Sequence, residues 1–200
     1  MIPARDALAR LKDGNARFTA SLKHSGTSGP RSPERTDVQD PFAIILGCSD
    51  ARVPAEIVFD QGLGDLFVIR VAGNIVAPSQ VASVEFAAER FNTRLVVVLG
   101  HSQCGAITAT LEELRLPPEK QSRNLHSIVD RVRPSVEGLL EGPVTSALVE
   151  AGVRANIRAS VNHLRNGSEV LEQLAYEHGL LVVGAEYSVE TGDVDFFDVP

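Results

Sequence analysis

Four short apolar runs most constrain the fold of this chain. They lie at residues 42–46, 66–71, 95–99 and 180–183, are rich in β-branched residues and scarcely alternate between apolar and polar positions. Strands that are apolar on both faces are typical of a parallel sheet covered by helices, because a sheet with one solvated face alternates. The sequence therefore predicts an α/β fold with a mostly parallel central sheet of about four strands, flanked by helices.

Helical patterns separate these runs and follow the third. Apolar residues recur at intervals of three and four, and Ser168 and Gly179 are suited to begin and to end the last helix. Helices are expected at residues 80–91, 106–114, 125–132, 144–164 and 168–176. The segment AEYSVETGDVDFFD predicts a hairpin that turns at Thr191 and Gly192, so a last strand joins the sheet antiparallel.

The N-terminal segment differs from this core. Leu8, Leu11 and Phe18 recur near helical spacing, and a stretch rich in Gly, Ser and Pro follows them. Residues 1–40 are expected to form a helix and an extended arm, and residues 41–200 an α/β core. The chain of 200 residues is long enough for these parts to make one domain with a sizeable core.

The composition argues against several classes of function. The formal net charge is −7 and no run of Lys or Arg is present, which speaks against a nucleic acid or an anionic membrane as partner. No stretch approaches the roughly 18 consecutive apolar residues of a membrane span, so no membrane insertion is expected. The charged N-terminal segment lacks the apolar region of a signal peptide, and two cysteines make no disulfide framework. A cytoplasmic protein is expected.

Candidate metal ligands follow two of the apolar runs. Cys48 comes after the first run, in CSDAR, and His101 and Cys104 come after the third, in GHSQC. Ligands of an open α/β sheet collect beyond the carboxyl ends of its strands, so the three side chains can meet there. Thiolate and imidazole are good zinc ligands, and three protein ligands leave a fourth position for water, as in catalytic sites. Cys104 also precedes a predicted helix, whose dipole favours a thiolate.

Simpler interpretations of the same residues stay open at this point. The two cysteines can be small buried apolar residues, or they can form a redox disulfide, although the chain has no CxxC motif. A histidine on an apolar strand is usually a core residue, and HxxC alone is a weak signal. The combination of HxxC with CxDxR upstream is the specific feature.

The segments CSDARVPAE and GHSQCGAI together resemble the zinc signature of the β-class carbonic anhydrases. The resemblance continues in order through ALARLKDGNARF, GDLFVIRVAGNIV, SVEFAAE and GAEYSVETGDV, and so covers nearly the whole chain. It implies one Zn²⁺ per chain, bound by Cys48, His101 and Cys104. It also implies reversible hydration of CO₂ to bicarbonate and a proton, by attack of zinc-bound hydroxide on CO₂, in a homodimer or homotetramer.

The resemblance assigns catalytic roles to two charged residues. Asp50 accepts the proton of the hydroxide in a hydrogen bond and aims an oxygen lone pair at CO₂. Arg52 holds Asp50 off the metal through charge-assisted hydrogen bonds. The alternative is an ordinary surface ion pair, commonly worth only about 0–1 kcal/mol.

Five further residues match the family's substrate site. Gln39 matches a glutamine that hydrogen-bonds a substrate oxygen, and in isolation it is an ordinary polar loop residue. Phe67, Ala72 and Phe86 match an apolar pocket for CO₂, a role compatible with plain core packing. Gly105 gives close backbone approach beside the metal, or is simply a glycine at a helix start.

Two other functions would use the same features. One is hydrolysis of a CO₂ analogue such as CS₂ or COS, and the other is a catalytically silent zinc domain with a structural or regulatory role. Asp50, Arg52 and Gln39 argue against the silent domain, because a structural metal requires none of them. Arg90 stands where plant-type members have a histidine linked to proton transfer, so no proton route is assigned.

A missing tryptophan bears on regulation. Some β-class members close at lower pH by binding bicarbonate in a second pocket, which uses a tryptophan three residues before the first cysteine ligand. Here that residue is Ile45, and the chain contains no tryptophan. Isoleucine has no N–H to donate to the anion. An open site, with Asp50 paired to Arg52, is therefore expected near neutral pH.

Overall fold

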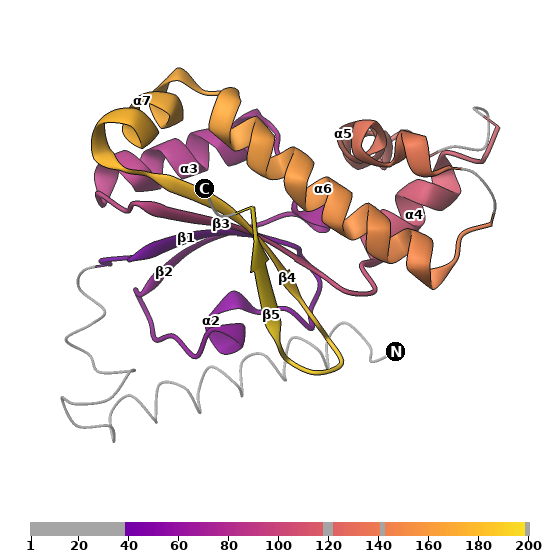
Figure 1. Cartoon of the computed structure of the whole chain (residues 1–200), viewed down its shortest axis with the longest axis horizontal. Coiled ribbons are helices and arrows are strands. Elements are labelled where there is room, and N and C mark those ends of the chain that lie inside the picture. Colours follow the sequence, from indigo (N-terminus) through magenta and orange to yellow (C-terminus); the bar gives the residue numbers. More distant parts are fainter. Residues whose placement is uncertain (1–38, 118–121, 141–142, 199–200) are drawn as a thin grey trace, which may run out of the picture.

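The centre of the computed structural model, which describes residues 39–117, 122–140 and 143–198, is a five-stranded sheet (Figure 1). Its strand order is β2-β1-β3-β4-β5. The strands are β1 (Ala43–Gly47), β2 (Leu66–Arg70), β3 (Leu95–His101), β4 (Leu181–Tyr187) and β5 (Val194–Phe197). All neighbouring pairs are parallel except β4 and β5. The predicted α/β class, with a mostly parallel sheet and an antiparallel C-terminal strand, is confirmed.

The five helices predicted for the core are present with small shifts of their ends. They are α3 (Pro78–Arg90), α4 (Gly105–Glu113), α5 (His126–Val136), α6 (Ser146–Asn166) and α7 (Glu169–His178). The structure adds three elements that the sequence did not predict: α2 (Ala55–Val58) and the 3₁₀ turns η2 (Ala72–Asn74) and η4 (Glu137–Leu139). These elements are three or four residues long, which is too short for a helical period to show.

Helices cover the two faces of the sheet unequally. α3, α4, α5, α6 and α7 lie on one face, and α2 lies on the other (Figure 1). Ile44 and Leu46 of β1 join the larger core beneath the five helices, whereas Ile45 joins a smaller core with Ala55 of α2. β1 is buried along its whole length because both of its faces are covered, which explains the lack of alternation in its sequence.

The ends of α7 and the C-terminal hairpin follow the predicted turn chemistry. Ser168 caps α7, and its hydroxyl accepts a hydrogen bond from the Leu171 N–H at 3.2 Å. Gly179 ends α7 in the left-handed conformation, with φ 69°, which glycine adopts without steric cost. Gly192, with φ 83°, lies in the turn between β4 and β5, as predicted.

Two strands run further than their apolar runs indicated. β3 continues through Gly100 to His101, and β4 continues to Tyr187, because the two strands pair along seven residues. Glu186 occupies a buried place in β4, where Arg154 of α6 donates to its carboxylate at 2.7 Å. The hairpin predicted over AEYSVETGDVDFFD already indicated a strand at these residues, and the structure shows that it is continuous with the apolar run at 180–183.

The predicted N-terminal helix and arm, residues 1–40, lie outside the described residues apart from Gln39 and Asp40. Among the helices that the structure describes, none combines the length and the apolar character needed to cross a membrane.

Candidate metal centre

The carboxyl ends of β1 and β3 bring the three predicted ligands together. Cys48 directly follows β1, and His101 is the last residue of β3. Cys104 is the N-cap residue of α4, after a short turn from β3. Because β1 and β3 are parallel neighbours, with Gly47 opposite Leu99, both strands deliver their ligands to the same edge of the sheet.

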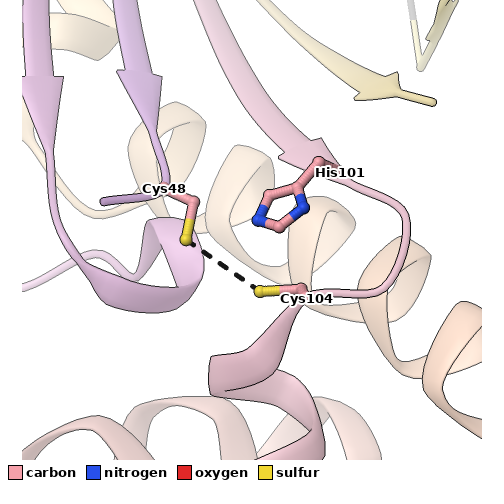
Figure 2. A group of neighbouring side chains, drawn as sticks. All are labelled: Cys48, His101 and Cys104. Atoms are coloured by element: carbon pink, nitrogen blue, oxygen red, sulfur yellow. Dashed lines mark hydrogen bonds between the residues drawn. The ribbon is translucent and has the colours of Figure 1, made fainter. Parts of the chain in front are cut away.

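The three side chains form one compact, buried cluster (Figure 2). Their ligand atoms all lie within 4.8 Å of one another, and the two sulfur atoms are 4.0 Å apart. A disulfide requires sulfurs at about 2.05 Å, so the cysteines are free thiols. Two sulfurs that each lie about 2.3 Å from a tetrahedral zinc ion are about 3.8 Å apart. The observed spacing fits a shared metal ion, and the disulfide interpretation is wrong for this structure.

His101 shows that the cluster fits a metal. Its Nδ1 lies 2.9 Å from the carbonyl oxygen of Ser102, and donation there leaves the lone pair on Nε2. The imidazole is fully buried, and Nε2 has no hydrogen-bond partner among the described residues. A buried polar atom without a partner is costly, but the same atom is a ready ligand. A backbone carbonyl on the other nitrogen is the usual support of a metal-bound histidine.

The ionisation of the two thiols also favours the binding of a cation between them. The hydrogen bond between them lowers the pKa of Cys48 to about 4, against the effect of burial. The same contact, together with burial, raises the pKa of Cys104. Two buried thiolates 4.0 Å apart would repel each other, so both can ionise only beside a positive charge. Two thiolates and one imidazole are a donor set that suits zinc.

Asp50 and Arg52 form a tightly paired unit beside the cluster. The Arg52 guanidinium donates to both carboxylate oxygens of Asp50 at 2.9 Å, and its backbone N–H adds a third bond at 3.0 Å. The side-chain hydrogen bonds from Arg52 hold the pKa of Asp50 well below its usual range. Asp50 Oδ2 lies 3.8 Å from Nε2 of His101. A carboxylate paired with Arg52 is thus held next to the three candidate ligands. An open site near neutral pH stays a prediction.

Arg70 was missed by the sequence analysis. It ends β2, opposite Gly47 of β1. Its guanidinium donates to the backbone carbonyls of Cys48 at 2.9 Å and Asp50 at 2.6 Å. Arg70 therefore fixes the backbone that carries both the first ligand and the acidic residue. Its position at the end of the apolar run next to Cys48 in the sheet was the signal in the sequence that could have identified Arg70.

Ala72 and Gly105 lie next to the cluster. Ala72 begins η2, and the N–H of the following residue, Gly73, lies 3.4 Å from the sulfur of Cys48. Gly105 follows Cys104 directly, at the start of α4. A Cβ added at Gly105 would meet no described atom within 4 Å.

The structure does not bring Gln39, Phe67 and Phe86 to the metal cluster of their own chain. Gln39 is exposed and precedes β1, at the end opposite Cys48. Phe67 pairs in register with Ile44, which lies four residues, or about 13 Å, before Cys48 along β1. The ring of Phe86, on α3, packs 6.1 Å from that of Phe67. These three residues therefore gather toward the other end of the sheet.

Comparisons with known proteins identify the family. A family profile described as carbonic anhydrase matches residues 43–194. The chain belongs to the carbonic anhydrase family. A carbonic anhydrase of Mycolicibacterium smegmatis is 38% identical over 186 residues, covering 92% of this chain and 89% of that protein. Carbonic anhydrase 2 of Mycobacterium tuberculosis is 37% identical over 187 residues, covering 91% and 87%.

Solved structures identify the class within the family. A tetrameric β-carbonic anhydrase of Sordaria macrospora has a TM-score of 0.80 at 23% identity, covering 97% of this chain and 98% of that chain. The β-carbonic anhydrase CcaA has a TM-score of 0.79 at 25% identity, covering 98% and 92%. The chain has the β-class fold, and its reaction is the reversible hydration of CO₂ to bicarbonate and a proton.

Proposed function

We propose that one Zn²⁺ per chain binds to Cys48, His101 and Cys104 and that CO₂ hydration takes place beside it. The observation that carries this proposal is the buried cluster of two thiols and an imidazole whose Nε2 lacks a partner. When bound, zinc supplies a Lewis acid that lowers the pKa of water toward neutrality. The two thiolates balance the charge of the ion.

Asp50 and Arg52 orient the reaction. The Asp50 carboxylate accepts a hydrogen bond from the attacking water or hydroxide, which turns an oxygen lone pair toward CO₂. Arg52 occupies both carboxylate oxygens and so keeps Asp50 from becoming a metal ligand. The Arg52 side chain also donates to the carbonyl of Gln103, at 3.2 Å, which ties the pair to the segment that carries Cys104.

A second copy of the chain completes the substrate site in this proposal. Gln39, Phe67 and Phe86 match the family's substrate residues, yet they lie far from Cys48 of the same chain. A homodimer reconciles the two facts, because a partner can present its own three residues to the metal of the first chain. Ala72 and Gly105 come from the same chain as the metal. The tetrameric state of the Sordaria macrospora enzymes supports further pairing of dimers.

The remaining assignments rest on narrower grounds. Relatives 37–38% identical along nearly the whole chain are carbonic anhydrases, so hydrolysis of CS₂ or COS and a silent zinc domain are not favoured. The cytoplasmic location and the single domain over residues 1–200 stay predictions from the sequence.

The deciding experiment is stopped-flow CO₂ hydration with zinc measured on the same sample. The unaltered chain should contain one zinc per subunit and be active. Cys48→Ser should lose zinc and activity together, because an alcohol is a poor substitute for a thiolate ligand. Ser127→Ala, an exposed change on α5, is the control and should alter neither.

Two outcomes would contradict the proposal. Full zinc content in Cys48→Ser would remove that residue from the ligand set. Zinc in the unaltered chain without CO₂ hydration would refute the reaction, and assays with CS₂ and COS on the same sample would then separate a hydrolase from a silent domain.

A further inference from the structure

Two polar residues of α6 are buried behind the metal centre. Asn156 and Ser160 are only 2% and 5% exposed, and a spacing of four residues places them on one face of the helix. Both donate to the backbone of η2: Asn156 Nδ2 to the carbonyl of Gly73 at 2.7 Å, and the Ser160 hydroxyl to that of Asn74 at 3.1 Å. Neither residue touches the three metal ligands directly.

The turn that they hold has an unfavourable backbone. Gly73 and Asn74 have φ values of 72° and 42°, so two successive residues lie in the left-handed region. This conformation is easy for glycine but costs free energy for asparagine, and it persists only where the surroundings fix it. In the described part of the chain, the carbonyl groups of this turn accept two side-chain hydrogen bonds, and both come from α6.

The same turn reaches the metal centre. The Gly73 N–H is directed at the sulfur of Cys48, 3.4 Å away. A hydrogen bond to a thiolate favours the charged form and restricts the direction in which its sulfur points. A chain of hydrogen bonds therefore connects Asn156 and Ser160, through the backbone of η2, to the sulfur of Cys48.

Close packing holds α6 near enough to the sheet for this chain of hydrogen bonds to form. Ile157, next to Asn156, lies against Gly100 of β3 and Gly184 of β4. A Cβ added at Gly100 would come within 2.5 Å of Ile157 Cδ1, and one at Gly184 within 3.0 Å of Ile157 Cγ2. The two glycines let α6 approach the sheet closely enough for two short side chains to reach η2.

We propose that Asn156 and Ser160 are positioning residues for the metal centre, which act through η2 on the sulfur of Cys48. The inference rests on the proposed zinc site and deepens it. With both side chains in place, Gly73 presents its N–H to the thiolate and Cys48 is held ready for the ion. Without them the strained turn relaxes and the sulfur loses its fixed direction. Loss of a direct hydrogen-bond partner of a metal ligand typically changes metal affinity about 10–100-fold, and loss of the Gly73 N–H contact to Cys48 would be a change of this kind.

The test measures metal release from the zinc-loaded enzyme in Asn156→Ala and Ser160→Ala. Release to an excess of a coloured chelator should be about 10–100-fold faster than in the unaltered chain. The cobalt-substituted variants should also show a shifted sulfur-to-metal charge-transfer band, because the thiolate has lost a hydrogen bond. A purely structural role in α6 would lower thermal stability without moving that band.

Asn162→Ala is the matched control, because Asn162 is exposed on the same helix. If both variants release zinc within twofold of this control and keep its cobalt spectrum, the inference is overturned. Should Asn156→Ala fail to fold, Ser160→Ala decides the matter, since it removes a single oxygen atom. Absence of zinc from the unaltered chain would overturn the proposed function and this inference together, whereas equal release rates overturn the inference alone.

Discussion

In the proposed function, Asp50 and Arg52 distinguish this site from a structural metal centre. A thiolate and imidazole cluster can hold zinc without a paired carboxylate beside it, yet here Arg52 fixes both oxygens of Asp50. Asp50→Ala should therefore keep its zinc and lose turnover, because it removes orientation and leaves the ligands intact. We expect kcat for CO₂ hydration to fall roughly 10²–10⁴-fold.

Zinc content and stopped-flow rates across pH check this expectation, with the exposed Asp40→Ala as control. A rate equal to that of the unaltered chain at every pH would show that Asp50 does not orient the reaction. Loss of zinc from Asp50→Ala would instead show that the residue supports the metal.

The three residues of the cluster could be found from the sequence, but the contacts that support them could not. Cys48, His101 and Cys104 follow or end apolar runs, and parallel strands bring such positions together. The support comes through backbone atoms: Arg70 reaches a carbonyl 22 positions away, and Gly73 donates its N–H to a sulfur 25 positions away. A backbone donor leaves no signature in residue types, so only the fold reveals it.

The same contrast holds for the elements. β1 and β3 were predicted because burial on both faces leaves an unbroken apolar run. The turn η2 was not, because it is short and its conformation depends on donors from α6, which follows it by more than 80 positions in the sequence. The hairpin segment at the end of β4 was predicted, but the ion pair that accompanies the burial of Glu186 was not, because Arg154 lies 32 positions away in the sequence.

The contact between α6 and β3 can be tested at Gly100. Gly100→Ala would place a methyl group within 2.5 Å of Ile157 Cδ1, so Ile157 or α6 must move. Overpacking of this kind typically lowers the free energy of unfolding by about 1–3 kcal/mol, measurable by urea denaturation. Zinc release should also become faster, because a displaced α6 draws Asn156 and Ser160 away from η2.

A second substitution separates crowding from other effects. In Gly100→Ala combined with Ile157→Val, the missing Cδ1 should restore part of the stability that the single change removes. Gly138→Ala, where an added Cβ meets nothing within 4 Å, is the control and should cost little. A Gly100→Ala variant as stable as Gly138→Ala would show that the close approach is not needed.

At the scale of the whole molecule, the β2 edge of the sheet has the features of a contact surface. β2 is one of the two edge strands of the described sheet, and most of its residues are only partly buried. Phe67, Phe86 and Phe91 form an aromatic cluster beside it, with ring centroids 5.7–6.1 Å apart. The Phe86 side chain is 52% exposed. An exposed aromatic group next to an edge strand, whose outer side has no partner among the described residues, is typical of a surface that a partner covers.

Mixing two inactive variants tests whether the partner completes the site. Cys48→Ser lacks the metal but keeps Gln39, whereas Gln39→Ala keeps the metal but lacks the amide. Gln39 is exposed in the single chain, so its substitution disturbs no packing within its own chain. In a mixed dimer, the metal of one chain meets the intact Gln39 of the other. After subunit exchange of an equal mixture, roughly a quarter of all sites should be intact, since half of the dimers are mixed and each has one complete site. CO₂ hydration should rise to that fraction of the unaltered rate.

If Gln39 served the metal of its own chain, no mixed dimer would contain a complete site and the mixture would be no more active than its components. Full activity at dilutions where sedimentation shows only monomers would likewise contradict a shared site.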